Sequence, residues 1–296
     1  AFVPAVMEHI ELAGVHSGDS ACIIPSVQIS KENLETIKEY TRKIAEEMHV
    51  KGLMNMQYAI ENGKVYVLEA NPRASRTVPL VSKVCNIRMV PLATDIITSE
   101  LTGRPSPVPT LKEQDIPYYG VKEAVFPFKM FQEVDPILGP EMRSTGEVLG
   151  LSPSYGEAFF KAQEATQSRL PLEGTVLISV NRKDKAEVVD VARSFYEDGF
   201  NIVATQNTYD LIAAAGIPAK KVITNGDIQL IINSPIGKDS VHDDSYLRKA
   251  AIKAKIPYMT TIAAAKATAS GISYVKAHGQ GEVNSIQNLH SQIRDK

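Results

Sequence analysis

A carboxylate and an amide lie close together in the segment Val67-Leu-Glu-Ala-Asn-Pro-Arg73. Glu69 and Asn71 are two residues apart in a stretch rich in β formers, so their side chains project from one face of a strand. Carboxylate and amide oxygens suit Mg²⁺ or Mn²⁺, which bridge to substrate phosphates. Arg73 and Arg76 follow, and guanidinium groups hold phosphate oxygens in a fork. The alternative is that Glu69 and Asn71 are solvated residues of a turn before a proline.

Gln57, in the strand predicted before the Glu61-Asn-Gly63 turn, is the natural third oxygen ligand. A strict two-residue turn would pair Gln57 with Leu68 and place Gln57 and Glu69 on opposite faces of the hairpin. The metal interpretation therefore requires a three-residue turn or a β-bulge, and we predict one.

The segment from Met7 to Ser20 gathers carboxylates, histidines, serines and glycines. Glu11 and Asp19 can hold an ammonium group, and the backbone of Gly14–Ser17 can lie against a nucleotide. Two histidines without a cysteine or a third histidine favour hydrogen bonding over zinc. The alternative is a polar loop closed by hydrogen bonds from Ser and Asp to the backbone.

Polar residues also follow the strands predicted in the C-terminal part of the chain. Ser179, Thr205, Thr208 and Asn233 come at strand ends, near helix N-termini, and Lys185 adds a positive charge. The carboxyl edge of an open parallel sheet is where such folds bind ligands, and helix N-termini favour phosphate. The alternative is that Thr208 is an N-cap and the others are ordinary loop residues.

Composition and missing motifs narrow the class of protein. The chain of 296 residues predicts about two domains, and its net charge of −2 argues against a polybasic nucleic-acid arm. It carries two cysteines, too few for a disulfide framework, and no apolar run long enough to span a bilayer, so a cytoplasmic protein is expected. GxxxxGK[ST], GxGxxG and GxSxG do not occur, which disfavours P-loop, dinucleotide-binding and α/β-hydrolase functions.

The elements of the first hundred residues must position the candidate metal ligands Gln57, Glu69 and Asn71. A strand is expected in residues 1–11, and the absence of an initial Met suggests a piece of a longer chain. The spacing of apolar residues predicts a helix over Ser30–Met48 with Ser30 as N-cap, a hairpin, a second helix and a proline-rich linker. The hairpin strands are expected at 52–60 and 64–70, the second helix at 78–100, and the linker at 103–109.

The remaining sequence changes from a mixed pattern to a regular one. A strand at 121–128 and a helix at 155–165 come first, and a boundary is expected at 171–174. Short strands then alternate with helices, which predicts a parallel sheet covered by helices on both faces. The strands are expected at 175–180, 201–205, 230–233 and 258–261, and the helices at 184–198, 208–215, 245–255 and 263–277.

Four motifs together resemble one family, the large subunit of carbamoyl phosphate synthetase. They are MEHIExAGVHSGDS at 7–20, LMNMQYA at 53–59, LEANPRASRTVPLVSK at 68–83 and VDPILGPEMRSTGEVLG at 134–150. The resemblance covers the whole chain and implies an α/β fold in two parts. Residues 1–168 would be the later portion of the second ATP-grasp unit, with a core at 1–100 and a linker and helical tail at 101–168. Residues 169–296 would be a methylglyoxal-synthase-like, Rossmann-like regulatory domain.

The resemblance also implies roles for individual residues. It implies nucleotide contacts for Gly14, Val15, His16, Ser17, Gln57 and Glu69. It implies Mg²⁺ or Mn²⁺ ligands at Gln57, Glu69 and Asn71, with Arg73 contacting phosphate. It implies an ornithine site at Glu11, Asp19, Glu123, Tyr258 and Thr260, and an effector-nucleotide site at Ser179, Lys185, Thr205, Thr208 and Asn233. Pro235 departs from the family, which commonly has threonine there, and this puts the effector in doubt.

The implied function is that of an ATP-dependent ligase. The family makes carbamoyl phosphate from bicarbonate, ammonia from glutamine, and two ATP, for arginine and pyrimidine biosynthesis. This part would phosphorylate carbamate. Its partners would be the N-terminal remainder of the large subunit, the small glutaminase subunit, an effector of the UMP or IMP type and ornithine, within an oligomeric enzyme and without nucleic acid or membrane.

Two rival interpretations remain. In the first, the isolated chain binds ATP weakly or not at all and makes no carbamoyl phosphate, so that it is an effector-binding module without chemistry. In the second, the chain is a lyase that acts on a triose phosphate, because His242 resembles a methylglyoxal synthase motif. The Gly-Gly-Asp segment that supplies that enzyme's catalytic acid has no match in this sequence, however.

Overall fold

The computed structural model describes residues 1–129, 138–221, 228–234 and 245–295. The described chain divides into two compact units that interleave along the sequence. Unit 1 contains residues 1–8, 23–120 and 283–296, and unit 2 contains residues 9–22 and 121–282. The family resemblance places a domain boundary after residue 168. These two compact units divide the chain in another way, so that boundary stays a prediction.

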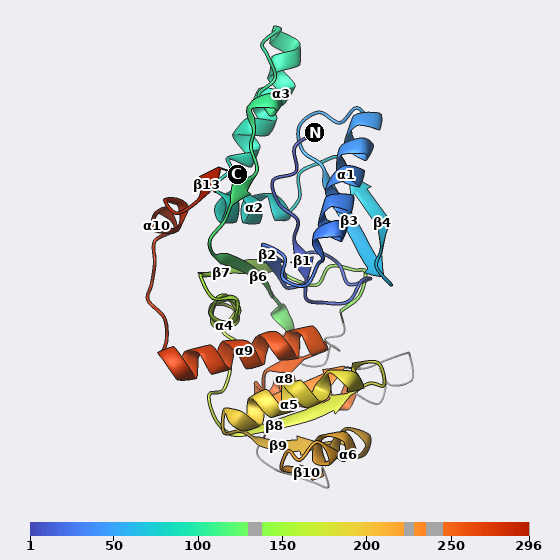
Figure 1. Ribbon diagram of the computed structural model, residues 1–296, viewed down its shortest axis with the longest axis vertical. Coiled ribbons are helices and arrows are strands. Elements are labelled where there is room, and N and C mark those ends of the chain that lie inside the picture. The colour runs from blue at the N-terminus through green and yellow to red at the C-terminus, as the bar shows by residue number, and fades with distance from the viewer. Residues whose placement is uncertain (130–137, 222–227, 235–244, 296) are drawn as a thin grey trace. The chain divides into compact units, whose positions relative to one another are not determined.

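Unit 1 is built around a helix and a hairpin (Figure 1). Helix α1 (Lys31–Glu47) begins as predicted, because the Ser30 hydroxyl accepts a hydrogen bond from the amide of Asn33. The hairpin strands are β3 (Asn55–Glu61) and β4 (Lys64–Asn71), and α1 packs on β4. Unit 1 therefore places the predicted metal ligands on a hairpin supported by an amphipathic helix.

The second predicted helix of unit 1 is two helices. They are α2 (Thr77–Cys85) and α3 (Met89–Thr102). The chain breaks between them at Asn86, whose left-handed backbone, with φ of 52°, ends α2. The proline-rich segment that follows contains the short helix η1 (Val108–Thr110), and β5 (Gln114–Asp115) pairs with the C-terminal β13 (Arg294–Asp295). Helix α10 (Ile286–His290) contacts α2.

A four-stranded sheet has the order β1-β2-β6-β7. Its strands are β1 (Glu8–His9), β2 (Cys22–Ile24), β6 (Tyr119–Val125) and β7 (Gly146–Ser152), and β6 leads to the short helix η2 (Pro127–Lys129). The strand expected over residues 1–11 is thus wrong except at Glu8–His9. Helix α4 (Tyr155–Ala165), predicted with these bounds, packs on β7 and on α9.

The regular part of unit 2 is a five-stranded parallel sheet, as the alternating pattern predicted. Its order is β10-β9-β8-β11-β12, and helix α8 packs on the face formed by Leu177 and Ile231. The strands are β8 (Thr175–Val180), β9 (Asn201–Ala204), β10 (Ala219–Lys221), β11 (Leu230–Ser234) and β12 (Tyr258–Met259). The helices are η3 (Asp184–Ala186), α5 (Val188–Glu197), α6 (Gln206–Ala214), α8 (Ser245–Ala254) and α9 (Ile262–His278).

Two predicted helix starts in this sheet region are wrong. Asp184 begins the separate short helix η3, and α5 begins at Val188 without a side-chain cap. Helix α6 begins at Gln206 with Thr205 in the N-cap position, so Thr208 is not an N-cap but lies inside the first turn. Among the described residues, no helix is long and apolar enough to cross a membrane.

Candidate functional sites

The β3–β4 hairpin brings the predicted metal ligands to one face. Its turn has two residues, Asn62 and Gly63, both with positive φ, as in a type I′ turn. A register shift next to Gln57 nevertheless pairs Gln57 with Glu69. The predicted bulge is therefore confirmed, with Leu68 as the extra residue, because β4 advances from 67 to 69 while β3 moves back from 58 to 57.

Asn55 extends this ligand face. It lies opposite Asn71, and directly opposed residues of an antiparallel pair share a face, so Asn55, Gln57, Glu69 and Asn71 project together. The amide of Asn55 also donates to the Thr77 hydroxyl at 3.3 Å. One carboxylate and three amides form a set of oxygen donors that fits Mg²⁺ or Mn²⁺.

Arg73 lies directly after this hairpin and is exposed. Its Nη1 donates to the carbonyl of Ala74 at 3.0 Å. This contact occupies one part of a guanidinium that carries five N–H donors, so the group can still reach a phosphate beside the ligand face.

Polar contacts hold the loop at Gly14–Ser17, one of them local and one to Gly139. The amide of Gly18 donates to His16 Nδ1 at 3.0 Å, and the amide of His16 donates to the carbonyl of Gly139 at 2.7 Å. An acceptor at Nδ1 places the proton of the neutral imidazole on Nε2, which can donate to a ligand. Gly14 has a φ of +102°, and a side chain added there would meet nothing within 4 Å. The loop backbone is thus open to close approach at Gly14.

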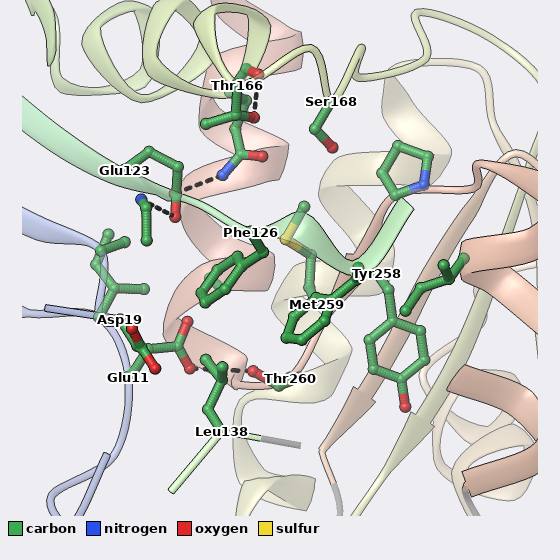
Figure 2. Close-up of a pocket in the computed structure, with 18 of the residues that line it drawn as sticks. Glu11, Asp19, Glu123, Phe126, Leu138, Thr166, Ser168, Tyr258, Met259 and Thr260 are labelled. Carbon is green, nitrogen blue, oxygen red and sulfur yellow. Dashed lines mark hydrogen bonds between the residues drawn. The ribbon is translucent and has the colours of Figure 1, made fainter. Parts of the chain in front are cut away.

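Unit 2 contains a cavity of about 300 Å³ with an acidic end, drawn in Figure 2. All five residues expected to bind ornithine line it: Glu11, Asp19, Glu123, Tyr258 and Thr260. Apolar side chains such as Phe126, Leu138 and Met259 line the rest. Carboxylates at one end of an apolar cavity favour a ligand with an ammonium group on a short hydrocarbon chain.

Burial changes the ionisation of the cavity's glutamates. Burial, and to a smaller extent the nearby charge of Glu11, together raise the pKa of Glu123 to about 7. Gln163 Nε2 donates to Glu123 Oε2 at 2.6 Å and favours the ionised form. Burial also raises the pKa of Glu11, whose Oε2 accepts from Thr260 Oγ1 at 3.0 Å. The two glutamates repel each other, and a ligand cation would relieve that repulsion.

Asp19 differs from the two glutamates. Its Oδ2 accepts from the amide of Arg143 at 2.7 Å and its Oδ1 from the amide of Ser144 at 2.9 Å. These bonds fix the Asp19 side chain at the cavity wall and tie the loop to the segment before β7. Asp19 thus matches both interpretations made from the sequence, a cavity carboxylate and a side chain that closes the loop.

The carboxyl edge of the parallel sheet forms a second pocket. Ser179, Lys185, Thr205 and Thr208 line it, as predicted. Thr205 Oγ1 donates to Ser179 Oγ at 3.1 Å, and Thr208 Oγ1 accepts from the amide of Val180. The pocket therefore offers hydroxyl groups and a positive charge where helix α6 begins, a suitable environment for phosphate.

Asn233 lies on β11 beside Ser179 but is not among the residues that line this pocket. It is buried, and its amide donates to the hydroxyl of Tyr258 at 2.7 Å. Pro235 and His242 lie outside the described residues.

Sequence reasoning missed several residues of these sites. Asn55 carried a usable signal, since it lies two residues before Gln57 on the same strand. Arg182 and Asn181 line the sheet-edge pocket and directly follow β8, so they could have been inferred from strand position. Gln163 has no local signal, because only the packing of α4 brings its amide to Glu123.

Comparison with protein families gives two matches. The family described as "Carbamoyl-phosphate synthase L chain, ATP binding domain" matches residues 5–100, and the "MGS-like domain" matches residues 187–224. The first match contains the ligand hairpin and the Gly14–Ser17 loop. The second begins just beyond Lys185 and contains Thr205 and Thr208 of the sheet-edge pocket.

Curated relatives match nearly the entire chain. The carbamoyl phosphate synthase large chain of Methanosarcina barkeri is 41% identical over 310 residues, which are 99% of this chain and 76% of that protein. The "Carbamoyl phosphate synthase large chain, C-terminal section" of Methanocaldococcus jannaschii is 42% identical and that of Aquifex aeolicus 43%. These two matches cover 99% and 98% of this chain, which spans 51% and 59% of the two relatives.

Proposed function

The chain belongs to the carbamoyl phosphate synthase large-chain family, and we propose that it supplies part of the site that phosphorylates carbamate. The observation that carries this proposal is the ligand face of the hairpin. The bulge at Leu68 places Gln57 opposite Glu69, so that oxygen donors from two strands converge. If Glu69 and Asn71 were only solvated residues of a turn, nothing would require Gln57 to lie opposite Glu69.

Phosphoryl transfer from ATP to carbamate depends on alignment and charge neutralisation more than on covalent catalysis. Gln57, Glu69 and Asn71 would hold Mg²⁺ or Mn²⁺, and a bound metal would neutralise charge on the β- and γ-phosphates. Arg73 would offset negative charge that develops on the transferred group. The reaction requires no protein nucleophile.

The loop at Gly14–Ser17 would contact the nucleotide. The open space at Gly14 supports this assignment, and so does the Nε2 proton of His16. ATP would be the substrate of the complete large subunit. The proposed partners of this chain are the N-terminal remainder of that subunit and the separate small glutaminase subunit.

Unit 2 would also carry two regulatory sites. Ornithine, a short chain with a terminal ammonium group, fits the acidic cavity at Glu11 and Glu123. A nucleotide of the UMP or IMP type would place its phosphate at Ser179, Lys185 and Thr205. These pockets favour a second candidate function for the isolated chain, an effector-binding module without chemistry.

A substitution in the full large subunit tests the catalytic proposal. Glu69→Gln keeps the size of the side chain but removes its charge, and should abolish ATP formation from ADP and carbamoyl phosphate. Glu61→Gln is the matched control on the same hairpin, because Glu61 pairs with Lys64 next to the turn, four residues along β3 from Gln57. Unchanged activity of the Glu69 variant would refute the site assignment.

Titration tests the regulatory proposal. Calorimetry of the 296-residue chain with UMP, IMP, UTP and N-acetylglutamate should show binding of a nucleotide. If none of these compounds binds, the effector function of the sheet-edge pocket is wrong.

A further inference from the structure

Lys122 is a buried lysine whose ammonium group contacts main-chain oxygens. Its exposed fraction is 4%, on strand β6. Its Nζ donates to the carbonyl of Ser17 at 3.1 Å and to the carbonyl of Gly18 at 3.2 Å. Withdrawing an ammonium group from water is costly, so these bonds must compensate for lost hydration. The charge is therefore tied to one feature of the chain, the end of the Gly14–Ser17 loop.

Strand β6 presents Lys122 and Glu123 to opposite sides. Neighbouring residues of a strand point to opposite faces, and Glu123 lines the acidic cavity while Lys122 reaches the loop. The ammonium group thus lies under the loop backbone and not in the cavity. Its bonds to two consecutive carbonyls also fix the direction of the peptide planes there.

The other contacts of this segment show what Lys122 adds. Ser144 Oγ donates to the carbonyl of Gly18 at 3.2 Å, and the amide of Asp19 donates to the carbonyl of His16 at 2.8 Å. These bonds hold Gly18 and the residue after it. Lys122 brings a charged donor to the carbonyl of Ser17, the last residue of the nucleotide loop.

We propose that Lys122 is a positioning residue for the nucleotide. It holds the Gly14–Ser17 loop in its binding conformation before the nucleotide arrives, and it does not touch the nucleotide. The inference rests on the proposed role of that loop in nucleotide binding. Since an ordered loop binds without a further loss of conformational entropy, losing Lys122 should weaken nucleotide binding and leave the chemical step intact.

The test uses the full large subunit and the formation of ATP from ADP and carbamoyl phosphate. Lys122→Met keeps the length of the side chain and removes its donors, and should raise KM for ADP by about 10- to 100-fold with kcat within about twofold. Lys122→Arg should restore most of the affinity, because it keeps charge and donors. Lys161→Met is the control, since Lys161 bonds Glu157 on helix α4.

Hydrogen exchange supplies a measurement that does not depend on turnover. In the 296-residue chain, Lys122→Met should speed exchange of the amides of residues 14–19 and leave strands β8 and β11 unchanged. If the Met variant does not fold, the Arg variant carries the test, with a rise in KM smaller than tenfold. Loss of kcat at unchanged KM, or unchanged loop exchange, would overturn the inference.

A loop variant separates this inference from the proposed function. If His16→Ala raises KM for ADP and Lys122→Met does not, the role of Lys122 is wrong and the nucleotide loop stands. If neither substitution changes KM for ADP, the loop does not bind the nucleotide, and the role proposed for Lys122 is then wrong as well.

Discussion

The raised pKa of Glu123 predicts that ornithine binding to unit 2 depends on pH near neutrality. Burial and the charge of Glu11 raise the pKa of Glu123 to about 7, so the carboxyl is largely protonated at pH 6 and largely ionised at pH 8. Only the ionised form pairs with an ammonium group. Lowering the pH through 7 therefore removes the charge that the ligand needs, and affinity should fall.

The magnitude follows from the ionised fraction. With a pKa of about 7, that fraction is roughly 0.1 at pH 6 and roughly 0.9 at pH 8, so the ornithine affinity should rise about tenfold across this range. The raised pKa of Glu11 acts in the same direction. Binding at pH 6 should also release about one proton from Glu123.

Calorimetry of the 296-residue chain in buffers of different ionisation enthalpy measures both quantities. Glu123→Gln should weaken binding and flatten its pH dependence, whereas Glu164→Gln, outside the cavity, should change neither. L-norvaline, which lacks the side-chain amine, should show no pH dependence. An ornithine affinity that stays constant from pH 6 to 8, or a slope that survives in Glu123→Gln, would refute the reasoning.

Two further predictions concern the rest of unit 2. Arg182→Gln should weaken binding of UMP by about tenfold at low salt, since a charge-assisted bond to phosphate is lost, whereas Lys183→Gln next to it should not; equal titration curves would exclude Arg182 from the pocket. Gly156→Ala should lower the free energy of unfolding in urea by about 1–3 kcal/mol or more, because its new Cβ would lie 2.6 Å from the carbonyl oxygen of Ser270 on α9. Gly146→Ala, whose Cβ would meet nothing closer than 3.7 Å, is the control that should keep wild-type stability.

Local signals made much of the fold predictable. The Ser30 cap and apolar spacing located α1, and the alternation of short strands with helices located the parallel sheet. The break at Asn86 was missed because the apolar pattern continues across it, and only the left-handed backbone ends the helix there. Helix α5 starts late because Asp184 and Lys185 belong to a separate turn.

The sites were predictable to different degrees. Gln57 and Glu69 were expected on one face because a metal site required it. That requirement predicted a three-residue turn or a bulge, but it could not say which of the two forms or where a bulge would lie. Glu123 was assigned to the ornithine site by the family resemblance alone, since most of its neighbours in the cavity are remote in sequence. Gln163 could not be inferred, because its contact with Glu123 depends on how α4 packs.

The bulge also determines where the hairpin can change its length. Deleting Leu68 would leave Tyr58 opposite Val67 and Gln57 opposite Glu69, so a protein one residue shorter at this point would keep the same ligand face. One residue added at Asn62-Gly63, with the turn still closed by two residues, would instead shift every pair and turn Gln57 away from Glu69. The hairpin can therefore lose the residue at position 68 and keep its ligand face, whereas a change in the turn keeps that face only if Glu61 stays opposite Lys64.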